Sequence, residues 1–179
     1  QDMLSSMKEK TGRVGVVLSS GVLYRGSETE IRQNIIEKHD YLVAIIQLGP
    51  NIFYGATLAP CILIFKDKKS KSEQGNVLII NALEFFKPGR SQNHLTENHV
   101  NQILKIYQNR EEKPHISKIV TITEIAEKNW NLSVLRYIEP EQKEAIIPLL
   151  QASSDLKKSI DDFEESEKVL EKLLQMEKL

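Results

Sequence analysis

Few side chains of this sequence are reactive, and their spacing defines no catalytic set. Cys61 opens an apolar run of residues, so we interpret it as a core thiol rather than a nucleophile. His94 and His99 flank a predicted loop–helix boundary, and no cysteine or second acidic residue accompanies them to complete a metal site. We therefore interpret both as surface histidines, and we predict no metal ion and no catalytic residue in this chain.

Three other groups of side chains have the chemistry to contact a ligand. Four lysines between two predicted strands could contact phosphate, although a solvated turn is the favoured interpretation: Lys66, Lys68, Lys69 and Lys71. Three arginines could face DNA, although surface or loop-structuring roles are favoured: Arg13, Arg25 and Arg90. Finally, Phe53 and Tyr54 lie at the centre of the glycine-containing connection 49–59.

The composition limits what this chain does alone. A formal net charge of −1 over 179 residues gives no overall attraction for DNA, so work on DNA needs phosphate contacts from another segment or partner. A single cysteine permits no internal disulfide and favours a reducing cytoplasm. No apolar run approaches the roughly 20 residues that cross a bilayer. The chain starts at Gln1 without a signal peptide, and we expect it to be a piece of a longer protein.

The apolar pattern predicts an α/β domain that positions these groups. The short apolar run 14–18 predicts a strand buried on both faces, as in a parallel sheet. A helix follows, with a capping box between Ser27 and Glu30. Its predicted buried stripe is Ile31, Ile35 and Ile36. A second apolar strand, residues 41–48, completes a βαβ unit.

The next predicted elements close the sheet. Residues 61–65 and 76–82 are predicted strands. Because no helical pattern separates either strand from the one before it, each is expected to pair antiparallel with that strand. Thr96 then caps a helix, and residues 116–122 predict a short last strand. The predicted buried stripe of this helix is Val100, Ile103, Leu104 and Tyr107.

From residue 142 onward glycine disappears and a heptad pattern begins. One set of residues recurs every seven positions: Leu149, Leu156, Phe163 and Leu170. The interleaved positions hold Ser153, Ile160, Glu167 and Leu174. This pattern predicts a long helix that needs a partner for its stripe, either the parent domain or helices of another subunit or a second copy. The predicted subunit interface is Leu149, Leu156, Ile160, Phe163, Leu170 and Leu174.

Several ordered blocks give the chain a family resemblance. The blocks are 12–18, 21–26, 52–55 with 60–64, 89–96, and the stretch from Glu124 through Asn131-Leu132 to Arg136-Tyr137. In this order they resemble the DNA N6-adenine methyltransferase (M) subunit of type I restriction-modification systems. The resemblance covers about residues 1–139, and the helical tail resembles the family in character only.

The resemblance implies a fold, a reaction and partners. It implies that residues 1–139 are the C-terminal part of a Rossmann-like, S-adenosylmethionine-dependent methyltransferase sheet, and that residues 140–179 are an α-helical assembly tail. It also implies methylation of adenine N6 in DNA. The implied partners are a specificity subunit, a second M subunit and a restriction subunit, with DNA bound through the assembled complex in the cytoplasm.

Two motifs of the resembled family do not occur in this sequence. The cofactor-binding glycine motif should follow a strand, but Gly12 and Gly15 do not. The catalytic Asn-Pro-Pro-Tyr/Phe motif has no match, because Gly49-Pro50-Asn51 has the wrong order. We therefore expect the chain by itself to bind no cofactor and to be inactive. The alternative is a non-catalytic scaffold and helical docking module for subunit assembly.

The resemblance gives the connection 49–59 a role. In N6-adenine methyltransferases an aromatic residue between the last two strands can pack against the flipped base, and Phe53 and Tyr54 occupy the matching loop. Stacking of this kind contributes roughly 1–3 kcal/mol per base. The alternative is that both rings hold the loop on the sheet.

Overall fold

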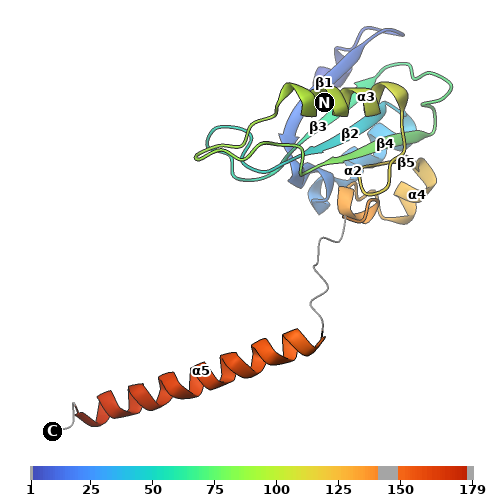
Figure 1. Ribbon diagram of the computed structural model, residues 1–179. Helices are drawn as coiled ribbons and strands as arrows, with labels where there is room; N and C mark the ends of the chain where they lie inside the picture. The colour runs from blue at the N-terminus through green and yellow to red at the C-terminus, as the bar shows by residue number, and fades with distance from the viewer. Residues whose placement is uncertain (1, 141–148, 177–179) are drawn as a thin grey trace. The chain divides into compact units, whose positions relative to one another are not determined.

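Five apolar segments form one sheet in the order β1-β3-β2-β4-β5 (Figure 1). The strands are β1 (Arg13–Ser19), β2 (Leu42–Leu48), β3 (Pro60–Lys66), β4 (Asn76–Ala82) and β5 (Ser117–Thr121). The computed structural model describes residues 2–140 and 149–176, and it divides the chain into two units, residues 1–141 and 142–179. The sheet belongs to the first unit, and the predicted α/β class is confirmed.

The strand order confirms one predicted pairing and corrects another. Strands β2 and β3 are antiparallel neighbours, as predicted, and β3 separates β1 from β2. Strand β4 does not pair with β3; it lies parallel to β2 on the other side. The connection 67–75 is therefore a crossover past the start of β2 rather than a hairpin turn. The antiparallel prediction was wrong because a short polar connection can also step over one strand.

Strand β1 is an edge strand, so the prediction that it is buried on both faces was wrong. It pairs with β3 alone, and Val17 and Leu18 on it are 49% and 36% exposed. Val14 and Val16 pack against the core on the face opposite Val17. An apolar run thus indicates a strand, but it does not tell how many of the faces are covered.

Helices cover both faces of the sheet (Figure 1). One face packs against the π-helical η3 (Asn34–Lys38), α4 (Ile122–Glu127) and η4 (Val134–Arg136), and α2 (Thr29–Gln33) leads directly into η3. The other face packs against α3 (Glu97–Asn109) through Ile103 and Ile106. The remaining short helices are α1 (Asp2–Ser5), η1 (Ser20–Leu23) and η2 (Gly26–Glu28).

The helix starts differ in how well the sequence predicted them. The capping box at Ser27 does not form, because Ser27 lies within η2 and the N-cap of α2 is Glu28, without a side-chain bond. Thr96 does cap α3: its hydroxyl accepts from the His99 backbone N–H at 3.3 Å, and His99 Nδ1 accepts from the Thr96 N–H at 3.3 Å. His99 is therefore a half-buried capping residue rather than a simple surface histidine.

The buried stripes of the helices were predicted in part. On α3, Ile103 is buried as predicted, but Val100 and Leu104 are 47% and 45% exposed, and Ile106 is buried instead. The face of the helix that meets the sheet thus contains Ile103, Ile106 and the partly buried Tyr107 rather than the predicted stripe. In the preceding helical segment Ile36 is buried, whereas Ile31 is 40% exposed.

The second unit contains the predicted long helix, α5 (Leu149–Met176). Four of its predicted interface side chains are exposed within the unit: Leu156, Ile160, Phe163 and Leu170. The side chains of Leu149 and Leu174 lie outside those that the structure describes. No helix among the described residues is long and apolar enough to cross a membrane.

Candidate functional site

Two connections leave the sheet at the carboxyl ends of β2 and β4. Because these strands are parallel neighbours, residues 49–59 and 83–95 lie at the same edge (Figure 1). In open α/β sheets, ligands bind beyond the carboxyl ends of the strands. We call residues 49–59 the aromatic loop and residues 83–95 the arm, and together they form the candidate site.

The aromatic loop presents its rings to solvent. Tyr54 is 96% exposed and Phe53 is 44% exposed, and every residue from 53 to 58 is exposed. Phe53 lines a shallow hollow with Val17 and Leu18 at the end of β1. Tyr54 therefore does not hold the loop on the sheet, and its ring face is free to meet a flat partner.

The arm folds back on itself as a small hairpin. Lys87 N–H donates to the His94 carbonyl at 2.8 Å, and His94 N–H donates to the Lys87 carbonyl at 3.0 Å. The turn between them is tight at Gly89, where a Cβ atom would lie 2.1 Å from the Gln92 carbonyl oxygen. Only glycine fits there without a shift of the backbone.

The arm is hydrogen-bonded to the start of the aromatic loop. Three successive carbonyls of the loop accept from two arm residues: the Pro50 carbonyl from Asn93 Nδ2 at 2.9 Å, the Asn51 carbonyl from Asn93 N–H at 2.8 Å, and the Ile52 carbonyl from Gln92 Nε2. Asn51 Nδ2 returns a bond to the Ser91 carbonyl at 3.2 Å. We call the bonds from Gln92 and Asn93 the carbonyl clamp.

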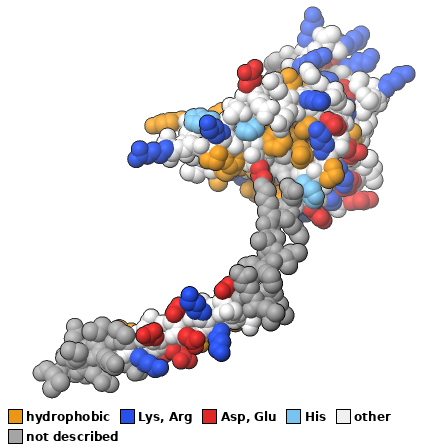
Figure 2. Space-filling model, in the orientation of Figure 1, with side chains coloured by type: hydrophobic (Ala, Val, Ile, Leu, Met, Phe, Trp, Pro, Cys, Tyr) orange, Lys and Arg blue, Asp and Glu red, His pale blue; other side chains and the backbone are white. Residues whose placement is uncertain are grey.

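The charge at this edge differs from that of the whole chain. The arm exposes Lys87, Arg90 and His94, with Glu84 as its one acidic residue, and the aromatic loop has no charged side chain. Figure 2 shows basic, histidine and hydrophobic side chains together at the projecting left end of the first unit. Cations beside exposed rings suit a partner with phosphates and bases. Arg90 thus lies at the candidate site, whereas Arg25 forms a 3.8 Å ion pair with Glu28.

A small hollow lies at the same edge of the sheet, beside the end of β2. Gln47 lines it together with Ser20, Leu83 and Val134, and its volume is about 190 Å³. Gln47 is 6% exposed and donates from Nε2 to the Pro60 carbonyl at 3.1 Å. Small-molecule sites usually measure roughly 300–1,000 Å³. The hollow has no acidic side chain, and it is too small to hold a nucleoside cofactor.

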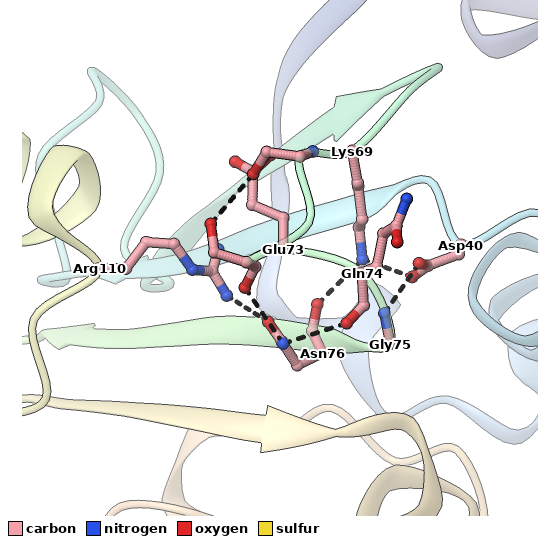
Figure 3. Close-up of polar contacts among 9 residues, drawn as sticks. Asp40, Lys69, Glu73, Gln74, Gly75, Asn76 and Arg110 are labelled. Atoms are coloured by element: carbon pink, nitrogen blue, oxygen red, sulfur yellow. Dashed lines mark hydrogen bonds and ion pairs between the residues drawn. The ribbon is translucent and has the colours of Figure 1, made fainter.

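The opposite edge of the sheet carries buried charges (Figure 3). Lys69 is 6% exposed; its Nζ donates to Asp40 Oδ1 at 2.5 Å and to the Asn76 carbonyl at 2.9 Å. Asp40 Oδ2 accepts from the Gly75 N–H at 2.9 Å. Burial lowers the pKa of Lys69, and the hydrogen bond with Asp40 opposes this shift.

A second ion pair completes this edge. Lys66 Nζ donates to Glu73 Oε1 at 2.5 Å, and Glu73 Oε2 accepts from Ser70. Burial would raise the pKa of Glu73, but the bonds from Lys66 and Ser70 outweigh it and hold the pKa at about 2. The prediction of a solvated lysine turn is therefore wrong for Lys66 and Lys69, and only Lys68 and Lys71 are exposed.

The other reactive groups have structural surroundings. Cys61 is fully buried, and burial raises the pKa of its thiol to about 11, so the interpretation as a core thiol is confirmed. Among the described residues, no three His, Cys, Asp or Glu side chains come together as metal ligands. His94 is exposed, as predicted.

Sequence reasoning missed the residues that support the site. Gln92 and Asn93 lie inside the block 89–96, yet their carboxamides gave no signal of the carbonyls that they bind. Arg32 is 7% exposed and binds the carbonyls of Val22, Arg25 and Trp130 and the Thr29 hydroxyl. Three of these four acceptors are backbone carbonyls, and the four partners are 10, 7, 98 and 3 positions away from Arg32. Such irregular separations form no spacing pattern that could be recognised in the sequence.

Comparisons with known proteins agree with this architecture. The model of the N-6 DNA methylase family matches residues 1–145. The chain is 38% identical over 161 residues to the type I restriction enzyme MjaVII methylase subunit of Methanocaldococcus jannaschii, which covers 87% of this chain and 26% of that protein. The chain thus spans about a quarter of the length of this curated relative.

Solved structures give the same result. A type I restriction-modification methyltransferase subunit from Streptococcus thermophilus superposes with a TM-score of 0.71 at 30% identity, covering 76% of this chain and 28% of that one. A chain from a structure that describes complex assembly of the type I restriction-modification system shares the fold, with a TM-score of 0.62 at 18% identity over 97% of this chain and 38% of that one.

These findings define the class and then the family. A mixed sheet with the order β1-β3-β2, helices on both faces and a loop pair at the carboxyl edge belongs to the S-adenosylmethionine-dependent methyltransferase fold. The chain belongs to the N-6 DNA methylase family, and its relatives are methylase subunits of type I restriction enzymes.

Proposed function

We propose that this chain acts as the closing part of a longer type I modification subunit, which methylates adenine N6 in DNA with S-adenosylmethionine. The observation that carries the proposal is the exposed aromatic loop, at the sheet edge where this fold binds ligands, in a chain that matches the family over residues 1–145. The chain matches only about a quarter of the length of its relative, and this supports the proposal that it is one part of a larger catalytic unit.

Within this proposal, residues 1–139 contribute a base-contacting loop and no cofactor site. Phe53 or Tyr54 stacks on the flipped adenine, and Arg90 and Lys87 lie near its flanking phosphates. The hollow beside Gln47, at the carboxyl edge of the sheet, does not fit S-adenosylmethionine, because it is only about 190 Å³ and lacks an acidic group for ribose hydroxyls. We therefore assign no step of methyl transfer to this chain alone, and we propose that it is inactive by itself.

Replacement of the rings tests the proposed role of the aromatic loop. In the full-length enzyme with its specificity subunit, Tyr54→Ala or Phe53→Ala should slow single-turnover methylation by roughly 5- to 150-fold, which corresponds to about 1–3 kcal/mol of stacking. Leu58→Ala is the matched control, because Leu58 is a 70% exposed apolar residue of the same loop. Unchanged rate and DNA affinity in both ring variants would contradict the proposal.

A titration tests the cofactor part of the proposal. Calorimetry of the 179-residue chain with S-adenosylmethionine should show no binding heat at concentrations where the full-length enzyme saturates. Stoichiometric binding by the isolated chain would show that it holds a cofactor site.

A second role, assembly of subunits, is favoured by the separate helical unit. We propose that α5 buries the exposed stripe of Leu156, Ile160, Phe163 and Leu170 against helices of a specificity subunit or a second M subunit, with a restriction subunit joining that complex in the cytoplasm. Deletion of residues 142–179 should weaken capture by the specificity subunit more than cofactor binding by the full-length enzyme. If the specificity subunit captures the deleted protein as well as the undeleted one, this role is refuted.

A further inference from the structure

The aromatic loop has little hydrogen bonding of its own. Within residues 52–58 the described backbone bond is from Ala56 N–H to the Phe53 carbonyl at 3.0 Å. None of the side chains from 53 to 58 is buried, so packing does not fix this half of the loop. A segment with few buried contacts opens easily, and its rings would sample many directions.

The carbonyl clamp supplies the missing support next to the rings. It holds the carbonyls of residues 50, 51 and 52, and Phe53 follows directly. Ile52 is 8% exposed, so its side chain anchors the loop while its carbonyl is held by Gln92. The path of the chain as it leaves Ile52 is therefore determined by the arm.

Carboxamides suit this task for a chemical reason. Backbone carbonyls need donors, and the Gln92 and Asn93 side chains donate without placing a charge next to the rings. A carboxylate at either position would lose the donor and repel the carbonyl oxygen. The donors come from a hairpin that is itself closed by the Lys87–His94 bonds, so they are held in place before any ligand arrives.

We propose that Gln92 and Asn93 are positioning residues, which set Phe53 and Tyr54 against the target base through the carbonyl clamp. This inference rests on the proposed function of the aromatic loop. Catalytic geometry is sensitive to such support, since a misplacement of about 1 Å can cost roughly 100-fold in rate.

The test uses the full-length enzyme with its specificity subunit. The combined variant Gln92→Ala/Asn93→Ala should slow single-turnover methylation by about 10-fold or more, whereas the Kd for DNA stays within about threefold. With 2-aminopurine at the target position, the variant should change the fluorescence of the flipped base in the same direction as Tyr54→Ala, because the ring no longer stacks on it. A purely structural role would not move this signal.

A double-variant cycle shows whether the clamp acts through the rings. In the background Phe53→Ala/Tyr54→Ala, adding Gln92→Ala/Asn93→Ala should slow the reaction by no more than about twofold. The control is Gln102→Ala, which removes an exposed carboxamide of α3 and should change neither rate nor fluorescence. If thermal unfolding shows that the combined alanine variant is not folded, Asn93→Leu replaces it, because this change removes the side-chain donor, nearly keeps the size of the side chain and adds no charge beside the rings.

The outcomes separate the two proposals. If the ring variants slow methylation but the clamp variants do not, the positioning role is overturned and the role of the aromatic loop stands. If the two losses add fully in the cycle, the clamp does not act through the rings and the positioning role is also overturned. If the ring variants themselves have no effect, the proposed function of the loop fails, and the positioning inference fails with it.

Discussion

At the amino ends of β2 and β4 the connections are held by buried charges, whereas at the carboxyl ends they are held by neutral carboxamides. Lys69 and Glu73 are 6% and 7% exposed, and each has a charged partner (Figure 3). At the other edge Gln92 and Asn93 bind backbone carbonyls, and the adjacent Tyr54 is 96% exposed.

The two kinds of contact differ in the free energy that is lost when one partner is removed. A buried ion pair costs several kcal/mol when one partner is lost, so it commits the chain to one crossover path. A neutral hydrogen bond contributes only about 0.5–1.5 kcal/mol, so it orients a loop that stays accessible. The amino edge is thus held more strongly than the carboxyl edge, where the rings of the aromatic loop stay exposed.

The largest expected effect is at the amino edge. Asp40→Asn should lower the free energy of unfolding by about 3 kcal/mol, because it removes the ion-pair partner of the buried Lys69 ammonium. Urea unfolding followed by the fluorescence of Trp130, the single tryptophan, measures this. Lys68→Met, on an exposed lysine of the same connection, is the control. A loss below about 1 kcal/mol for Asp40→Asn would remove the contrast between the two edges.

The next largest effect is the loss of folding stability at acid pH. The folded pKa of Glu73 is about 2, below its ordinary value of 4.5, so its contribution is present above pH 4.5 and is lost as the pH falls towards 2. The loss is of the order of 2–3 kcal/mol. Unfolding free energies measured at several acid pH values should therefore fall less steeply in Glu73→Gln. If the free energy of unfolding falls equally steeply with pH in the unmodified chain and in Glu73→Gln, the bonds from Lys66 and Ser70 do not stabilise the Glu73 carboxylate.

A smaller effect on stability is expected in the arm. Gly89→Ala should cost about 1–2 kcal/mol, because its Cβ would lie 2.1 Å from the Gln92 carbonyl oxygen and the turn must shift. The shift displaces Gln92, so methylation by the full-length enzyme should slow as in the clamp variants. Gly26→Ala meets no atom within 4 Å and is the comparison. Full activity of Gly89→Ala would show that a shift of this turn does not displace the aromatic loop.

The smallest effect on stability is expected at the rings. Tyr54→Ala should change the free energy of unfolding by less than about 0.5 kcal/mol, since the side chain buries almost no surface. A stable variant with slow methylation is the combination that separates a ligand-binding ring from a core residue. A loss of stability as large as that of Asp40→Asn would mean that Tyr54 supports the fold.

The sequence by itself determined the elements and the family. Apolar runs located β1 to β4 within one or two residues, and Thr96 marked the start of α3, because these signals are local. The ordered blocks from Gly12 onward carried the resemblance that the family match confirmed. They also placed Phe53 and Tyr54 in the loop between β2 and β3.

Only the tertiary structure decided which strands pair and which charges are buried. The parallel pairing of β4 with β2 depends on the crossover past Asp40, and this crossover buries Lys69, which reads as a solvated turn residue in the sequence. The carbonyl clamp joins residues about 40 positions apart in the chain. Partners at such separations leave no periodic or spacing signal, since hydrogen bonds to backbone carbonyls require no particular partner side chain.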